Sequence, residues 1–291
     1  MSNAVVLTDF GAPEVLRWQQ VALPEPGPGQ IRLKVAAAGV GPTDLAIRSG
    51  HLRAFGAAPG GVLGFEAAGT VDMVGPGVTG VSAGDEVAAQ LLSLGGYAES
   101  AIADIWTVKP AGVSWEDAAA LPASAEAAVR VLDEVQLESG QTLVLYGGGG
   151  SVGIIATQLA IARGARVLSV VRGHDEQLVR ELGAEPVILS ATVRADAAVD
   201  AAGTGVLPHA LAAVGDPRRV VTLADPRAAE FGVRLSGPRP DAAPAALAET
   251  MQMLASGRLQ LRAHRTLPLR EAAEAHRQLE AGIREKLILI P

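Results

Sequence analysis

Four consecutive glycines separate a short apolar segment from a helix-like one, and Gly148, Gly150 and Gly153 have the spacing G-x-G-x-x-G. In a dinucleotide-binding loop the first glycine permits a tight turn, the second lets the backbone approach a pyrophosphate, and the third lets the helix pack closely on the strand. The N–H groups at the helix start then face the anion. The segment therefore predicts a dinucleotide site, with a purely structural turn as the alternative. The predicted cofactor contacts here are Gly147, Gly148, Gly149, Gly150, Ser151, Val152 and Gly153.

The type of dinucleotide depends on the residues about twenty positions after the glycines, where an NAD site usually has an acid that binds the ribose hydroxyls. This chain has Val170 and Val171 there, followed by Arg172. A guanidinium suits a 2'-phosphate, so the sequence predicts NADPH as the cofactor. Two alternatives stay open: Arg172 is a solvated loop cation, or Asp175 is near enough to allow NADH.

The elements around the glycines alternate between strand and helix. Apolar runs predict strands, and helix-forming runs of suitable length lie between them. We expect strands at 143–146, 166–171, 185–189 and 219–223, and helices at 151–163 and 175–182. Strands and helices that alternate in this way imply βαβ crossovers and a parallel sheet.

The first hundred residues have a different sequence pattern, in which proline and glycine interrupt short β-type segments. We expect strands at 4–7, 30–36, 69–74 and 86–89, followed by helix-forming sequence from residue 114. Near the other end of the chain, the pattern predicts helices at 242–256 and 271–280 and a final strand at 287–290. The change from β-type to helix-forming sequence predicts a domain boundary near Pro122.

The composition excludes several classes of function. The net charge is -7 and the 24 basic residues are scattered, so no basic stripe is present for nucleic acid or an anionic membrane. The chain has no cysteine, which excludes disulfides, thiolate-bound zinc and a cysteine nucleophile. Residues 142–162 carry no charge, but the glycines inside them argue against a membrane span. We find no secretory signal pattern at the N-terminus and expect a cytoplasmic protein.

Six segments, in this order, resemble the medium-chain dehydrogenase/reductases, and within them the zinc-free quinone oxidoreductase branch, the zeta-crystallin-like one. The segments are AVVLTDFGAPEVL, PEPGPGQIRLKVAAAGVGPTDLAIRSG, LGFEAAGTV, GGYAES, YGGGGSVGIIATQLAIARGARV and HRTLPLREAAEAHRQLEAG. The resemblance implies an α/β protein with a β-rich GroES-like substrate domain, 1–121 and 258–291, and a Rossmann doubly wound parallel-sheet cofactor domain, 122–257. It also implies a homodimer that pairs through the edge of the Rossmann sheet, for which 231–235 is the candidate strand.

The resemblance also indicates how this chain departs from the zinc enzymes of the same superfamily. Gly41, Pro42 and Phe65 stand where those relatives carry metal-binding residues, so no zinc is expected. The implied reaction is transfer of a hydride from NADPH to a quinone or an α,β-unsaturated carbonyl compound without metal. The alternatives are an enoyl reductase acting on a thioester or polyketide-like intermediate, and a non-catalytic NADPH-binding sensor or structural protein.

Hydride addition leaves an anion, so a hydrogen-bond donor near the carbonyl oxygen is expected. Thr43 stands where zinc-dependent relatives have a hydroxyl that contacts the substrate; its alternative is a turn or capping residue. His51 could donate a proton near neutral pH, and its alternative is a residue facing solvent. Gly41, Leu52 and Tyr97 complete the predicted substrate contacts, with packing as the alternative for Tyr97.

Later strand ends should line the cofactor cleft, and by resemblance they add Ala202, Gly203 and Leu223 to the cofactor contacts. Two departures bear on the nicotinamide pocket. Residues 125–127 are Ala-Glu-Ala where the branch has Gly-Leu-Thr, which removes a hydroxyl. Residues 189–200 are also shorter than the usual strand-helix-strand unit.

Overall fold

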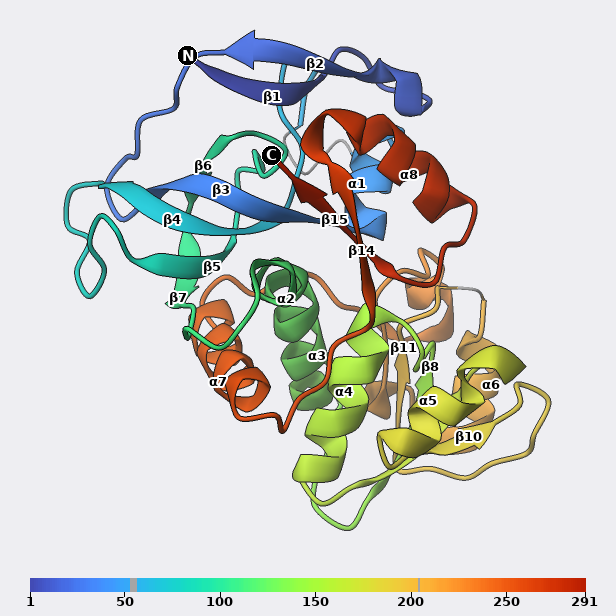
Figure 1. Ribbon diagram of the computed structural model, residues 1–291. Coiled ribbons are helices and arrows are strands. Elements are labelled where there is room, and N and C mark those ends of the chain that lie inside the picture. The colour runs from blue at the N-terminus through green and yellow to red at the C-terminus, as the bar shows by residue number, and fades with distance from the viewer. Residues whose placement is uncertain (53–56, 204) are drawn as a thin grey trace. The chain divides into compact units, whose positions relative to one another are not determined.

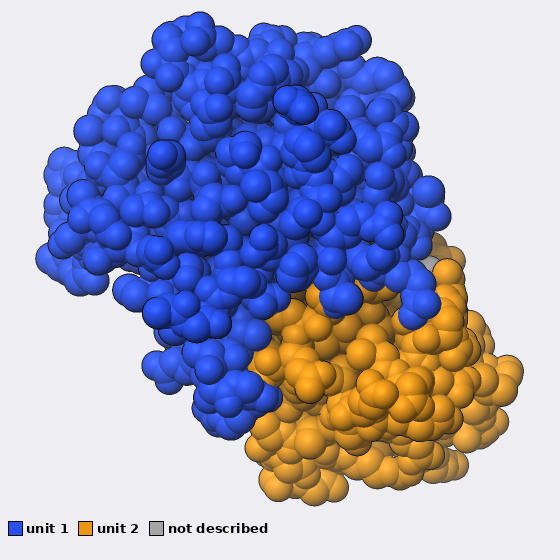
Figure 2. Space-filling view, in the orientation of Figure 1, with its two compact units in different colours: residues 1–123, 247–258, 263–291 blue, residues 124–246, 259–262 orange. Residues whose placement is uncertain are grey.

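The computed structural model describes residues 1–52, 57–203 and 205–291. The chain divides into two compact units, shown in different colours in Figure 2. Unit 1 comprises residues 1–123, 247–258 and 263–291, and unit 2 comprises residues 124–246 and 259–262. The boundaries that the sequence indicates, after residues 121 and 257, stay predictions.

Unit 1 is the β-rich part of the protein. Among the residues described, it contains a seven-stranded sheet with the order β14-β15-β3-β4-β5-β7, in which β6 also pairs with β3 (Figure 1). The strands are β3 (Ile31–Val40), β4 (Glu66–Val74), β5 (Glu86–Gln90), β6 (Ser100–Ala103), β7 (Ile105–Val108), β14 (His264–Pro268) and β15 (Lys286–Ile290). A separate antiparallel pair consists of β1 (Ser2–Leu7) and β2 (Leu16–Val21).

The core of unit 1 lies on these strands, several of which are buried over most of their length, as in β3, β5 and β15. Leu33, Val71, Val87 and Leu289 belong to one buried apolar cluster. The helices that accompany the sheet are the 3-10 helix η1 (Pro13–Val15), α1 (Pro42–Arg48), α2 (Trp115–Ala120), the 3-10 helix η6 (Leu269–Glu271) and α8 (Ala272–Glu280). Helix α2 begins where the sequence predicts a helix start, because the Ser114 hydroxyl accepts a hydrogen bond from the Asp117 N–H, 3.1 Å away.

Unit 2 is built on a parallel sheet. In the part of the chain that the structure describes, this sheet has six strands in the order β10-β9-β8-β11-β12-β13. The strands are β8 (Thr142–Tyr146), β9 (Arg166–Val170), β10 (Glu185–Val187), β11 (Ala197–Asp200), β12 (Val220–Thr222) and β13 (Arg234–Leu235). This is the doubly wound order of a Rossmann sheet, in which the strand sequence reverses beside β8.

Helices connect most of these parallel strands, as right-handed crossovers require. They are α4 (Ser151–Ala162), η3 (Gly173–Asp175), α5 (Glu176–Glu181), α6 (Leu207–Val214), η4 (Pro217–Arg219) and η5 (Ala228–Phe231). Residues 188–196, all of them described, contain no helix, so the connection from β10 to β11 is short, as the sequence indicates. Helices α3 (Pro122–Glu134) and α7 (Ala243–Ala255) each contain residues of both units.

The predicted fold class is confirmed: a GroES-like domain accompanies a Rossmann-type parallel sheet. Most predicted elements agree with the structure within a few residues. The prediction of a strand at 231–235 is partly wrong, because Phe231 belongs to the 3-10 helix η5 and only Arg234–Leu235 pairs with β12. The sequence pattern does not predict the strands β2, β6, β7, β11 and β14 or the helix α6.

Candidate functional site

The glycine loop follows β8 directly and ends at α4. The Gly147 N–H donates to the Val170 carbonyl at 3.1 Å, so the loop begins beside the end of β9. The Gly150 N–H closes the turn on the Gly147 carbonyl at 3.0 Å. Gly150 is the N-cap of α4 and supplies no side-chain acceptor, so the N–H groups of the first helical turn keep their capacity to bind an anion.

Two of the glycines are required by close approach. A Cβ at Gly148 would lie 1.8 Å from Ser169 Oγ, and a Cβ at Gly153 would lie 2.3 Å from the Gly147 carbonyl oxygen. Gly153 excludes any side chain because the near atom belongs to the backbone, whereas a side chain at Gly148 would require the Ser169 hydroxyl to turn away. Such close packing is typical of a backbone that approaches a phosphate. The geometry of the loop therefore suits the binding of a dinucleotide.

Asp200 organises the carboxyl ends of the neighbouring strands β11 and β12. Its Oδ1 accepts hydrogen bonds from the N–H groups of Ala202 and Gly203, both at 2.9 Å. Its Oδ2 accepts from the Thr222 hydroxyl at 2.8 Å. The predicted contacts Ala202, Gly203 and Leu223 thus follow strands that adjoin β8 or one another, at the edge where ligands of doubly wound sheets bind.

The segment after β9 carries the residues that bear on the choice of cofactor. Arg172 is exposed and is the N-cap of η3, where it makes no side-chain capping bond. The Asp175 N–H donates to the Arg172 carbonyl at 2.9 Å, so the chain turns back and brings the two residues to the same end of the sheet. The structure therefore places Arg172 and Asp175 on one turn after β9, with the Asp175 carboxylate close to Gly149.

Arg262 also contacts the glycine loop, and the sequence analysis did not find it. Its Nη1 donates to the Gly149 carbonyl oxygen at 2.6 Å. The two residues are far apart in sequence, and no spacing rule joins them. Only the folded chain shows that the Arg262 guanidinium donates a hydrogen bond to the loop.

In unit 1, Asp44 fastens the start of α1. Its carboxylate accepts hydrogen bonds from the Gly41 N–H at 2.9 Å and from the Gly64 N–H at 3.2 Å. Burial raises the pKa of Asp44 to about 6, and these backbone donors oppose the rise. Asp44 is therefore the residue whose side chain closes the capping box at the start of α1, with Gly41 as the N-cap, and it fills the capping role that the sequence left open for Thr43.

Glu66 and Lys286 form a buried ion pair in the same unit. The other carboxylate oxygen of Glu66 accepts the Ala123 N–H at 2.9 Å. The side chains are only 3 % and 7 % exposed, so each charge depends on the other and on the hydrogen bond for its solvation. Lys286 was missed as a partner, although the chain has only three lysines.

Tyr97 is completely buried, and its hydroxyl lies 3.1 Å from Nε2 of His276. Because Tyr97 has no exposed surface, the burial favours the packing alternative, and its role as a substrate contact stays a prediction. His276 is buried as well, and burial, with the nearby Arg48 charge, lowers its pKa to about 3. The phenol–imidazole pair is thus a neutral structural contact.

The remaining predicted substrate-side residues lie on or next to α1. Thr43 is in its first turn and is partly exposed, as is Gly41 at its N-cap. His51 is exposed, and its Nδ1 lies 2.7 Å from Ser49 Oγ. Leu52 is partly buried against the apolar cluster of unit 1. The structure therefore groups Gly41, Thr43, His51 and Leu52 along one short segment.

The positions at which zinc-dependent relatives carry metal ligands hold residues here whose side chains cannot bind a metal. Gly41 and Pro42 begin α1, and Phe65 is buried. Within residues 1–52, 57–203 and 205–291, no group of three or more His, Cys, Asp or Glu side chains could hold a metal ion. In the same ranges no helix is both long enough and apolar enough to cross a bilayer.

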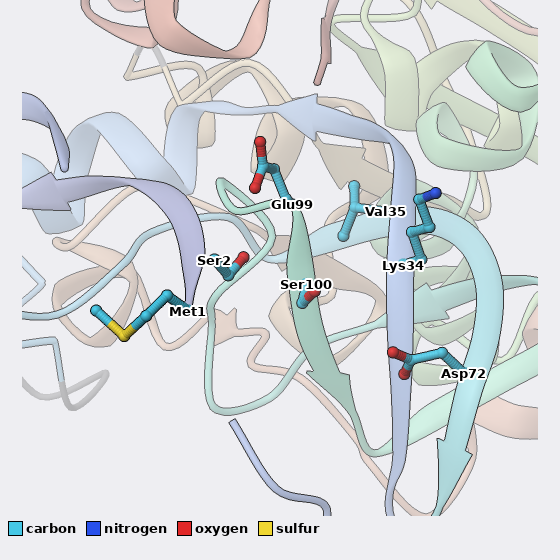
Figure 3. Close-up of a pocket in the computed structure, with 7 residues that line it drawn as sticks. All are labelled: Met1, Ser2, Lys34, Val35, Asp72, Glu99 and Ser100. Carbon is cyan, nitrogen blue, oxygen red and sulfur yellow. The ribbon is translucent and has the colours of Figure 1, made fainter. Parts of the chain in front are cut away.

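One surface hollow, of about 290 Å³, lies in unit 1 (Figure 3). It is lined by Met1, Ser2, Lys34, Val35, Asp72, Glu99 and Ser100. None of the site residues predicted from the sequence lines it. We assign the hollow no role in the reaction.

Two family models match the chain. Residues 27–115 match the alcohol dehydrogenase GroES-like domain, and residues 122–284 match the zinc-binding dehydrogenase family. The second match covers more than half of the chain.

Among characterised proteins, the chain is 34 % identical to the quinone oxidoreductase of Rattus norvegicus over 192 residues, which are 64 % of this chain and 58 % of that protein. It is 31 % identical to the 2-methylene-furan-3-one reductase of Solanum lycopersicum over 194 residues, 62 % of this chain and 50 % of that protein. The match thus spans about half to three fifths of the length of these relatives.

Among solved structures, the quinone oxidoreductase from Coxiella burnetii superposes with a TM-score of 0.90 at 26 % identity, covering 100 % of this chain and 99 % of that one. A mycobacterial protein complexed with NADPH superposes with a TM-score of 0.84 at 27 % identity, covering 100 % of both chains.

Proposed function

Because this chain belongs to the zinc-binding dehydrogenase family of the medium-chain dehydrogenase/reductase superfamily, we propose that it is an NADPH-dependent oxidoreductase that reduces a quinone or an α,β-unsaturated carbonyl compound without metal. The observation that carries the proposal is the glycine loop, in which Gly153 leaves no room for a side chain and Gly148 packs closely on Ser169. The relatives named above include reducers of both acceptor classes, and one structural relative is complexed with NADPH.

The residues that would hold the dinucleotide are those of the glycine loop and the following helical turn, Gly147 to Gly153, with Ala202, Gly203 and Leu223 from the neighbouring strand ends. Arg172, exposed after β9, is the proposed ligand of the 2'-phosphate. When bound, the cofactor supplies a hydride, which is chemistry that the protein side chains cannot perform.

Hydride addition to a carbonyl-conjugated acceptor leaves negative charge on its oxygen, which a hydrogen-bond donor stabilises. We assign this role to the partly exposed Thr43 hydroxyl, which is not occupied in capping α1 because Asp44 caps it. His51 is the proposed source of the proton that completes the reduction. The Ser49 hydroxyl donates to the Ala46 carbonyl, so the His51 Nδ1–H is the donor to Ser49. In the imidazolium form Nε2 carries a second proton, and this is the proton that His51 would give to the reduced acceptor, leaving the neutral imidazole.

We also propose a homodimer formed through the edge strand β13. Its Leu235 is 53 % exposed, and an edge strand presents unpaired backbone groups to a second copy. Size-exclusion chromatography with light scattering should give twice the mass of the chain at micromolar concentration; the mass of one chain would contradict the dimer. The cytoplasmic location stays a prediction.

The first test is the oxidation of NADPH, and separately of NADH, by the purified protein with quinones, enones, an enoyl thioester and simple aldehydes. We expect turnover with quinones or enones and faster turnover with NADPH. Reduction of the thioester alone would identify the enoyl reductase instead. Binding of NADPH with no turnover across the panel would contradict the enzymatic proposal and support a non-catalytic binding protein.

A further inference from the structure

Residues 259–262, here called the strap, belong to unit 2, although the residues on both sides of them belong to unit 1. The backbone of the strap is bound at Gln260 by a side chain of helix α4. Gln158 Nε2 donates to the Gln260 carbonyl oxygen at 2.8 Å, and the Gln260 N–H donates to Gln158 Oε1, also at 2.8 Å. Leu259 beside it is 2 % exposed. The strap therefore has a fixed position on α4.

The strap brings a guanidinium to the glycine loop. Arg262 Nη1 donates to the Gly149 carbonyl oxygen at 2.6 Å. The N–H of the same peptide group, that of Gly150, donates to the Gly147 carbonyl at 3.0 Å. Because a peptide group is planar, hydrogen bonds at both of its ends fix its orientation. This peptide group directly precedes α4, whose first N–H groups are proposed to face the pyrophosphate of the dinucleotide.

The loop has little of its own to hold this orientation. Residues 147–150 are all glycine, and a glycine backbone has the largest conformational freedom to lose when it becomes ordered. An N–H group of a charged guanidinium makes a stronger hydrogen bond to a carbonyl than a neutral donor does. A loop that is ordered before a ligand arrives binds it more tightly, because ordering the loop then takes nothing from the binding free energy. The contact from Arg262 should therefore act on affinity.

We propose that Arg262 is a positioning residue that orders the glycine loop for the pyrophosphate of a dinucleotide. The inference rests on the proposed function, because it needs a dinucleotide at the loop. It goes beyond that proposal in assigning part of the affinity to a residue 113 positions after Gly149 in the sequence. NADPH and NADH have the same pyrophosphate, so Arg262 strengthens the binding of both to the same extent.

The test is isothermal titration of the full-length protein with NADPH and with NADH, for the wild type, Arg262→Met and Arg262→Lys. Methionine keeps an unbranched stem and removes the donors, so we expect both dinucleotides to bind about tenfold more weakly. Lysine keeps a charged donor, so its affinities should lie within about threefold of those of the wild type. Arg258→Met is the matched control. Arg258 is exposed and its Nε donates to Ser256 Oγ, so both affinities should stay within about twofold of the wild type.

Adenosine 2'-phosphate separates this role from general damage to the protein. It carries the adenosine and the 2'-phosphate of NADPH but no pyrophosphate, so Arg262→Met should bind it as tightly as the wild type does. An equal loss for adenosine 2'-phosphate and for NADPH would overturn the inference.

Three other results would overturn the inference while leaving the proposed function intact. They are unchanged binding of both dinucleotides by Arg262→Met, a loss in Arg262→Lys as large as in Arg262→Met, and the same loss in Arg258→Met. If the wild type binds neither dinucleotide, the inference and the proposed function both fail. Because the measurement is of binding, a missing substrate cannot produce any of these results.

Discussion

The glycine loop of unit 2 and the buried side-chain charges of unit 1 accommodate charge in different ways. In unit 2, the glycine loop offers backbone N–H groups, and the polar residues around it, such as Asp200, orient further backbone groups at the strand ends. In unit 1, complete side-chain charges are buried, as in the pair Glu66–Lys286 and in Asp44. The difference shows that a site for a phosphate can be built from neighbouring residues, whereas the buried charge of Glu66 has its partner 220 residues away in the sequence.

The largest effect should come from removing one member of the buried pair in unit 1. Lys286→Met leaves the Glu66 carboxylate buried without its cation, so the free energy of unfolding should fall by about 3–5 kcal/mol. Urea unfolding of the variant measures this change. Glu185→Gln is the control, because the Arg166–Glu185 pair is 61 % and 55 % exposed and its loss should cost less than about 1 kcal/mol. Equal losses in both variants would contradict the comparison.

Asp44 and His276 are two buried groups of unit 1 whose contributions to stability change in opposite directions with pH. The pKa of Asp44 is raised from 3.8 to about 6, so its contribution to stability is present below pH 4 and is lost as the pH rises to 6, a change of about 3 kcal/mol. The pKa of His276 is lowered from 6.5 to about 3, so its contribution is lost as the pH falls through that range.

Asp44→Asn removes the first contribution and keeps the second. We therefore expect the variant to lose stability more steeply than the wild type when the pH is lowered from 6 to 4, whereas His276→Gln should lose it less steeply. Unfolding in urea at several pH values measures both slopes. Identical pH profiles for the three proteins would show that neither group titrates as described.

In unit 2, adding a single methyl group to the glycine loop should weaken cofactor binding. An alanine inside a helix is usually more stable than a glycine by up to about 1 kcal/mol, but Gly153→Ala would place Cβ 2.3 Å from the Gly147 carbonyl oxygen. The loop must then shift, and we expect NADPH binding to weaken about a hundredfold, or by about 3 kcal/mol. Gly112→Ala, where no atom lies within 4 Å of the added Cβ, should bind as the wild type does. Tight binding by Gly153→Ala would show that this glycine is not needed for the cofactor.

A smaller effect tests the polar contribution of unit 1 to the reaction. Thr43→Val keeps the shape of the side chain and removes the hydroxyl, so kcat with the best acceptor should fall about tenfold while the affinity for NADPH stays the same. Steady-state kinetics together with cofactor titration separate the two quantities. Unchanged turnover would remove Thr43 from the site and leave it as a residue of the first turn of α1.

The smallest effect should come from the exposed cation of unit 2. Arg172→Ala should weaken NADPH binding about fivefold and leave NADH binding nearly unchanged, because an exposed charge is screened by solvent and salt. Titration at low and at high ionic strength should show the NADPH effect shrinking with salt. Equal losses for NADH and NADPH would contradict a role at the 2'-phosphate.

The parallel sheet of unit 2, its glycine loop and the family resemblance could be predicted from the sequence because each depends on residues that are close along the chain. The run from β8 through the glycines into α4 contains its own turn chemistry and its own helix start. The short connection from β10 to β11 could also be predicted, since length is a local property. The missed strands β6 and β7 are four residues each and are stabilised mainly by pairing with other strands.

The side-chain partners could not be predicted in the same way. Glu66 meets Lys286, Tyr97 meets His276 and Arg262 meets Gly149 across more than a hundred residues in each case. The sequence by itself determined the fold class and the site of the glycine loop, because periodicity, turn residues and glycine spacing act over a few neighbouring residues. Only the tertiary structure decided which charges are buried, which are paired and that Asp175 packs on the loop, because burial and pairing depend on segments that meet only in the folded chain.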